Sequence, residues 1–133
     1  MGSVYTVQVV GTNLPQAQAN ALAAEVEQRL QEVNRQMSHY EPDSELSRFN
    51  RAPANTPFKV SPEFARVARF ALELCRRSEG ALDPTLAPVV NLWGFGEQTH
   101  PQTVPPESEV RAALKKTGCR HASGLPSRIS PPP

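Results

Sequence analysis

The most regular alternation of apolar and polar positions in the chain lies between residues 13 and 37. Apolar side chains recur there every three or four positions against a face of Gln, Glu and Arg, which is the spacing of one side of an α-helix. Asn13 and Gln16 stand three residues apart, as in a capping box. The pattern therefore predicts a helix beginning after Asn13, with an apolar stripe made of Leu22, Val26, Leu30, Val33 and Met37.

Start and stop signals predict three further helical segments. Ser61-Pro62-Glu63 supplies a cap, a first-turn proline and a first-turn acid, and Gly80 accepts the left-handed conformation that ends a helix. Between these signals, one predicted apolar face holds Phe64, Val67, Ala68, Ala71, Leu74 and Cys75. The other two segments are a short turn over 45–51 capped by Ser44, and a helix from Pro105 or Pro106 to Lys116 ended by Gly118.

A strand is predicted only over Val4 to Val10, where β-branched and aromatic residues place Tyr5, Val7 and Val9 on one face. One strand needs partners before it is stable. The missing strands lie either in stretches that read as loops or in sequence outside this chain, and we favour the second. The predicted fold class is α+β or α/β, with helices packed on a mixed sheet whose other strands are mostly absent. From Cys119 the chain is rich in Ser and Pro, which predicts a disordered or extended proline-rich tail.

Composition narrows the classes of function. The chain has 133 residues, 14 basic and 13 acidic, with a net charge of +1, so it shows no basic surface for nucleic acid. It has no apolar run long enough for a transmembrane segment, and its start lacks the pattern of a signal peptide. Cys75 fits an apolar helix face as a small buried side chain. Whether it forms a disulfide with Cys119 is not decided by the sequence, which gives no distance between the two residues.

The segment from Gly80 to Gly96 contains Asp83 as its only charged residue. One interpretation is a buried loop that packs a small core. The other is a wall of a nucleotide pocket, in which glycines admit the ligand, Trp93 and Phe95 offer flat faces, and Asp83 accepts hydrogen bonds.

No catalytic constellation is evident elsewhere. The histidines at positions 39, 100 and 121 have no metal-ligand spacing, and no Ser-His-Asp arrangement, phosphate-binding glycine loop or Cys-x-x-Cys pair occurs. We therefore predict no catalytic and no metal-binding residue in this chain.

Several motifs together resemble the N-terminal part of the FAD:protein FMN transferases, the ApbE family. Their order and approximate spacing agree over about residues 1–121. The matching pieces are Met1-Gly2-Ser3, Met37-Ser38-His39-Tyr40, Ser44-Glu45-Leu46-Ser47-Arg48-Phe49-Asn50, Gly80-Ala81-Leu82-Asp83 and Asn91-Leu92-Trp93-Gly94-Phe95-Gly96.

The resemblance implies an enzyme that uses FAD as substrate, requires Mg²⁺, and transfers FMN to a threonine hydroxyl of a target flavoprotein subunit with release of AMP. By position, the flavin-nucleotide contacts would be Met1, Tyr40, Ala81, Leu82 and Asp83. We expect Tyr40 to supply a flat face, and Trp93 and Phe95 to support the loop around Asp83 from behind.

The chain also departs from the family pattern. Family members are more than twice as long, and the Mg²⁺ carboxylates and a lysine contact to FAD belong to the part not present here. We expect residues 1–121 to form the N-terminal portion of the transferase domain and 122–133 an aberrant tail, and we hypothesise a reading-frame change or early end near Cys119. Members are usually exported, often as lipoproteins, so the compartment stays open. Our main interpretation is a member of the transferase family whose chain, as given, is inactive by itself. The alternatives are a flavin-nucleotide-binding module without catalysis and a non-enzymatic interaction fragment.

Overall fold

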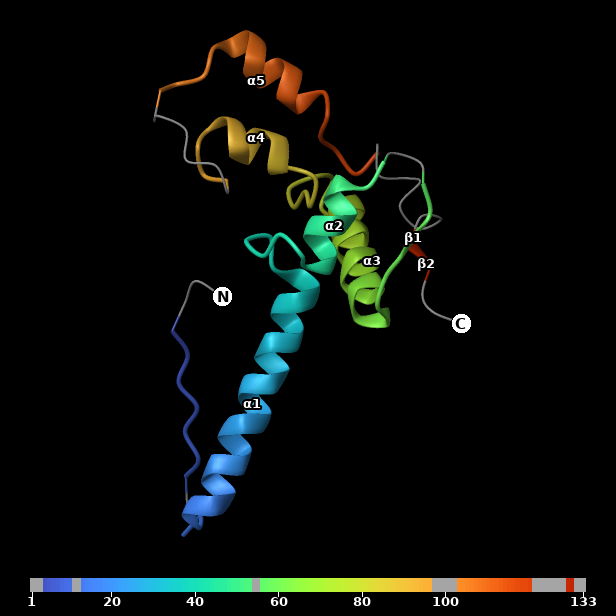
Figure 1. Cartoon of the computed structure of the whole chain (residues 1–133). Helices are drawn as coiled ribbons and strands as arrows, with labels where there is room; N and C mark the ends of the chain where they lie inside the picture. The colour runs from blue at the N-terminus through green and yellow to red at the C-terminus, as the bar shows by residue number, and fades with distance from the viewer. Residues whose placement is uncertain (1–3, 11–12, 54–55, 97–102, 121–128, 131–133) are drawn as a thin grey trace. The chain divides into compact units, whose positions relative to one another are not determined.

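The described part of the chain is mostly helical, with two short strands (Figure 1). The computed structural model describes residues 4–10, 13–53, 56–96, 103–120 and 129–130. The chain divides into two units, residues 1–50 and 51–133, and each is described by itself. The elements are α1 (Gln16–Met37), α2 (Glu45–Arg51), β1 (Phe58–Lys59), α3 (Pro62–Arg77), α4 (Ala87–Leu92), α5 (Glu107–Leu114) and β2 (Ile129–Ser130).

Helix α1 confirms the longest predicted helix but not its predicted cap. Pro15 is the N-cap residue, and no side chain caps the helix. The carbonyl of Pro15 accepts hydrogen bonds from the amides of Gln18 and Ala19 at 2.9 and 3.0 Å. The capping box was wrong because Asn13 lies two residues before the N-cap, too early to reach the free amides of the first turn. None of the residues of α1 is buried, and Leu22 and Val33 of the predicted stripe remain 39% and 48% exposed.

The strand predicted over residues 4–10 is not formed. The segment has no regular secondary structure, and Val4 and Val10 are 97% and 88% exposed. A strand is stabilised by the backbone of a neighbour, and within the described ranges β1 and β2 pair only with each other. The Tyr5 hydroxyl donates to Glu27 Oε2 of α1 at 2.7 Å. This hydrogen bond raises the pKa of Tyr5 and lowers the pKa of Glu27.

Helix α2 begins as predicted after Ser44. The Ser44 hydroxyl accepts a hydrogen bond from the Ser47 amide at 3.0 Å and donates to the carbonyl of Ser38. Ser44 and Ser47 are both buried, at 1% and 7% exposure. These contacts join the end of α1 to the start of α2 and confirm the predicted cap.

Helix α3 carries the buried core. Ser61 caps it, accepting the Phe64 amide at 3.2 Å, and Pro62 stands in its first turn as predicted. The inward face is rotated from the predicted one, because Ala65 and Leu72 are buried whereas Val67 is 51% exposed. The buried apolar residues are Val60, Phe64, Ala65, Leu72 and Cys75.

Helix α3 is followed by two residues in the left-handed conformation, Glu79 and Gly80. The Gly80 amide donates to the Cys75 carbonyl at 2.9 Å, and the Glu79 amide donates to the Arg76 carbonyl at 3.2 Å. This pair of bonds is a Schellman motif. Gly80 has φ 90° as expected, but Glu79 has φ 53° and occupies the position that glycine usually takes.

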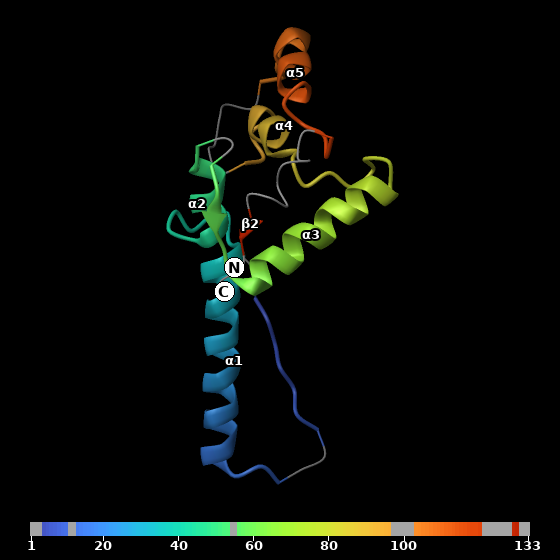
Figure 2. The same ribbon diagram turned by 90° about the vertical axis from the view of Figure 1, so that its right-hand side faces the viewer.

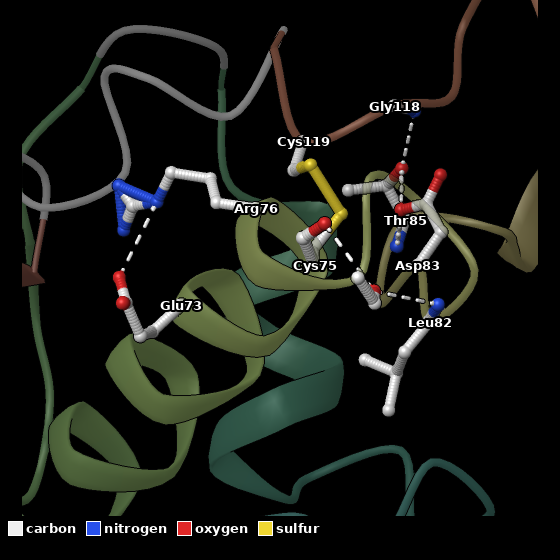
Figure 3. The surroundings of a disulfide bond; sticks show 9 residues. Glu73, Cys75, Arg76, Leu82, Asp83, Thr85, Gly118 and Cys119 are labelled. Carbon is white, nitrogen blue, oxygen red and sulfur yellow. Dashed lines mark hydrogen bonds and ion pairs between the residues drawn. A yellow bond between two sulfur atoms is a disulfide. The ribbon is translucent and has the colours of Figure 1, made fainter.

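A disulfide bond joins Cys75 in the last turn of α3 to Cys119 beyond α5 (Figure 3), with their Cα atoms 6.2 Å apart. The bridge that the sequence left open is therefore formed. Cys75 is fully buried, so the bond lies against the core. Helices α4 and α5 pack against each other within the same unit (Figure 2).

Strands β1 and β2 form a parallel pair, with Phe58 opposite Ile129 and Lys59 opposite Ser130. The sequence predicted neither strand, because two residues are too short for a period-two pattern to be recognised. In the described part of the chain this pair is the whole sheet, so the predicted mixed sheet is not observed.

Replacing Glu79 by glycine is expected to stabilise the unit formed by residues 51–133. A side chain in the left-handed region costs about 1–2 kcal/mol, partly offset by the larger entropy of an unfolded glycine, so we expect a gain of about 0.5–1 kcal/mol. The matched variant Gly80→Ala should lose about 1 kcal/mol through backbone strain alone, because an added Cβ would meet nothing within 4 Å. Urea unfolding of both variants tests this, and a destabilised Glu79→Gly protein would contradict it.

Removing the disulfide is expected to lower the free energy of unfolding by about 3–4 kcal/mol, because the bond closes a loop with a sequence separation of 44 residues. The suitable variant is Cys119→Ala, since Cys119 is only partly buried and fully buried Cys75 stays in place. Urea unfolding with and without dithiothreitol measures the loss. Reduction should destabilise the native chain and leave the Cys119→Ala variant unchanged; equal sensitivity of both proteins would refute the assignment.

Candidate functional site

The candidate site is the loop that leaves the end of α3. Ser78, the C-cap residue, accepts the Leu82 amide on its hydroxyl at 3.1 Å and the Ala81 amide on its carbonyl at 3.0 Å. The Ser78 hydroxyl in turn donates to the carbonyl of Cys75 at 3.4 Å. Ala81 and Leu82 are exposed. Of the three predicted contact residues in this loop, Ala81 and Leu82 are thus presented to solvent on a turn that is hydrogen-bonded to the helix end.

Asp83 is the centre of a second group of hydrogen bonds (Figure 3). Its Oδ1 accepts the Thr85 amide at 2.8 Å and the Thr85 hydroxyl at 2.7 Å. Thr85 Oγ1 also accepts the amide of Gly118 at 2.7 Å, across 33 positions of sequence. Asp83 and Thr85 are half-buried. Within the described residues the hydrogen bonds of Asp83 all end on Oδ1, which leaves Oδ2 as the oxygen for a ligand donor.

Thr85 was not among the predicted site residues. The available signal was local: an Asp followed two residues later by Thr favours a turn in which the carboxylate accepts a backbone amide. The contact between Thr85 and Gly118 gave no such signal, because nothing in their separation indicates that they meet.

The segment after Asp83 contains helix α4 and is not a buried loop, whereas its interpretation as a wall of a nucleotide pocket stays a prediction. None of residues 80–96 is buried, and α4 ends in a second Schellman motif. There the amide of Phe95 donates to the carbonyl of Val90 at 3.1 Å, and Gly94 has φ 76°. Gly94 therefore takes the left-handed position that ends α4.

Gly96 lies close to Asn91 of α4. A Cβ placed on Gly96 would approach Asn91 Cγ to 2.7 Å and Asn91 Cα to 3.1 Å, so this position has no room for a side chain. The aromatic residues on either side of Gly94 are exposed, Trp93 by 42% and Phe95 by 78%. Neither ring is buried, and the expectation that they support the Asp83 loop from behind stays a prediction.

Tyr40 belongs to the first unit and is 66% exposed. Its amide donates to the Ser38 hydroxyl at 3.3 Å, and its ring centroid lies 3.8 Å from that of His39 with the planes tilted by 40°. Tyr40 thus presents an accessible flat face on a turn fixed by Ser38. Met1, another predicted contact, lies outside the described residues.

Over the same described ranges, no group of three His, Cys, Asp or Glu side chains is arranged to hold a metal ion. Nor is any described helix both long and apolar enough to cross a membrane.

Comparison with known proteins gives a consistent picture. A model of the ApbE family matches residues 1–129. The FAD:protein FMN transferase of Vibrio cholerae is 42% identical over 121 residues, which cover 91% of this chain and 36% of the relative. That of Haemophilus influenzae is 42% identical over 111 residues, covering 83% and 32%.

A solved structure agrees with the sequence matches. The flavin transferase ApbE from Vibrio cholerae superposes with a TM-score of 0.74 at 46% identity, covering 77% of this chain and 33% of that one. The expected likeness to part of the ApbE fold is confirmed by this superposition. The chain spans about a third of the length of the curated relatives it matches. Because the family pattern extends over nearly the whole sequence and a solved member shares the fold, the chain belongs to the ApbE family.

Proposed function

We propose that this chain provides part of the FAD-binding site of an FAD:protein FMN transferase. In the proposed reaction a threonine hydroxyl of a target flavoprotein subunit attacks the phosphorus of the FMN half of FAD. A phosphoester bond forms, the pyrophosphate bond to the AMP half breaks, AMP leaves and the hydroxyl proton is released. Two relatives that are 42% identical to this chain carry the name FAD:protein FMN transferase, which supports the proposal.

The observation that carries the proposal is the fixed geometry of the loop from Ala81 to Asp83. Backbone groups of Ala81 and Leu82 are bonded to Ser78, and Asp83 is bonded to Thr85. A loop that is already ordered loses little entropy when it binds a ligand. In our proposal the exposed backbone and Asp83 Oδ2 accept hydrogen bonds from hydroxyl or amino groups of the dinucleotide.

Two further contacts are proposed from their positions in the family pattern. Tyr40 would place its exposed ring against a ring of FAD, since stacking on an accessible aromatic face is favourable. Met1 would contact the same nucleotide.

Magnesium dependence is proposed for the reaction as a whole, where a cation would neutralise the phosphate oxygens. The described residues do not fit such an ion, because they contain no cluster of three ligating side chains. We therefore assign no metal-dependent step to residues of this chain.

The mixed sheet also belongs to the proposal. Residues 4–10 have β-branched side chains on an extended, exposed segment without a sheet partner among the described residues. We propose that this segment pairs as a strand in a protein of the relatives' full length.

A second candidate is a flavin-nucleotide-binding module without catalysis. The hydrogen-bonded loop around Asp83 offers acceptors to a nucleotide and no group that reacts with it, which suits binding as well as transfer. The release of AMP from FAD in the presence of a threonine-containing acceptor protein separates the two candidates, because a binding module would release none.

The variant Asp83→Asn is expected to weaken FAD binding by about tenfold or more, because a hydrogen bond to a charged group contributes about 1.5–3 kcal/mol. Asparagine keeps Oδ1 as an acceptor for Thr85, so the loop should stay intact while the charge is lost. Titration of flavin fluorescence measures the dissociation constant. The control is Glu109→Gln on exposed α5, which should bind FAD as the native chain does; an unchanged constant in Asp83→Asn would remove Asp83 from the site.

Binding of FAD to this chain is expected to be insensitive to Mg²⁺. The reason is the lack of a three-ligand cluster in the described residues. The same fluorescence titration, repeated with millimolar MgCl₂ and with EDTA, should give equal dissociation constants. Tighter binding with Mg²⁺ would show that the chain supplies metal ligands after all.

A further inference from the structure

Thr85 makes three hydrogen bonds. Two of them end on one carboxylate oxygen of Asp83, and the third joins Gly118 to the Thr85 hydroxyl. Its amide and its hydroxyl donate to Asp83 Oδ1 at 2.8 and 2.7 Å, and its hydroxyl oxygen accepts the Gly118 amide at 2.7 Å. A hydroxyl has one hydrogen and two acceptor positions. The Gly118 amide uses one acceptor position, and the hydroxyl hydrogen is donated to Asp83 Oδ1.

Two donors from one residue fix the direction of the carboxylate more firmly than one. Bonds to an ionised acceptor are about twice as strong as neutral ones, and donors in a chain polarise one another. With Oδ1 held by Thr85, rotation about the side-chain bonds of Asp83 is restricted and Oδ2 faces a constant direction. The half-buried position of both residues limits competition from water.

The donor end of this chain of bonds, the Gly118 amide, is fixed by covalent structure. Gly118 precedes Cys119, and Cys119 is bonded to Cys75 in the last turn of α3 (Figure 3). The same helix end holds Ser78, which bonds Leu82 next to Asp83. Asp83 is therefore held from both sides, through Ser78 along the chain and through Thr85 across it.

We propose that Thr85 is a positioning residue for flavin-nucleotide binding: its hydroxyl, oriented by the Gly118 amide, sets the Asp83 carboxylate so that Oδ2 meets a donor of FAD. The inference rests on the proposed function, because it assumes that Asp83 contacts the dinucleotide. Thr85 acts through Asp83 and does not itself touch the ligand.

The test compares two substitutions at position 85 in the whole chain. Thr85→Val has nearly the same shape and lacks the hydroxyl, whereas Thr85→Ser keeps it. The probe is FAD, titrated into ¹⁵N-labelled protein up to millimolar concentration, with amide chemical shifts as the readout and thermal unfolding as a check of folding. We expect about five- to tenfold weaker binding for Thr85→Val and less than a twofold change for Thr85→Ser.

A double-mutant cycle separates positioning from a general structural effect. In an Asp83→Ala background, Thr85→Val should weaken FAD binding no further, because the group that Thr85 positions is gone. A further loss of the same size in that background would overturn the inference, as would native affinity in Thr85→Val or a lack of rescue by Thr85→Ser.

Failure of the proposed function has a different signature. If Asp83→Ala binds FAD as the native chain does, or if millimolar FAD moves no amide resonance, the proposed site falls and the inference falls with it. If Asp83→Ala weakens binding and Thr85→Val does not, only the inference falls.

A measurement on the native chain covers the case in which Thr85→Val does not fold. FAD should slow hydrogen exchange at the amides of Thr85 and Gly118, since a ligand held by Oδ2 restrains the carboxylate to which both are linked. Unchanged exchange at both amides under saturating FAD would contradict the proposal.

Discussion

The covalent bond between Cys75 and Cys119 is the constraint on which the second unit depends. It joins the last turn of α3 to the segment after α5 and so closes the loop, the α4 helix and the α5 helix into one ring. The described core is small, with few buried apolar side chains, most of them on α3. A small core contributes little hydrophobic stabilisation, so a restriction of the unfolded chain counts for more.

The same bond determines where the candidate site can be. Because Cys119 is held at the end of α3, the neighbouring Gly118 amide lies within reach of the Thr85 hydroxyl, and Thr85 holds Asp83. The loop also begins at the end of that helix, where the Schellman motif and Ser78 set its direction. The site is thus a helix terminus whose outgoing loop is held at both ends, which is a suitable frame for ordered acceptors.

The proposed function joins this frame to the chemistry of FMN transfer. Transfer of FMN from a dinucleotide depends more on the positioning of the reactants than on reactive side chains, because an alcohol must attack one phosphorus in line. In the proposed function, the loop around Asp83 would hold FAD in place.

Features that depend only on neighbouring residues could be predicted from the sequence. The caps at Ser44 and Ser61, the α1 helix and the left-handed Gly80 depend on residues within one or two helical turns, and each was found where predicted. The position of the Asn13 cap was wrong because Pro15 sets the start of α1.

Contacts between distant residues were decided only by the tertiary structure. The disulfide, the hydrogen bond from Gly118 to Thr85 and the pairing of β1 with β2 each join segments at least 33 positions apart. A local sequence pattern does not indicate which distant segments lie close together in space. The exposed segment 4–10 shows the converse, since its strand-like residues form no strand without a neighbouring backbone to accept and donate hydrogen bonds. Propensity is a property of a few residues, whereas a ladder, a bridge or a positioned carboxylate is a property of the pairs that folding brings together.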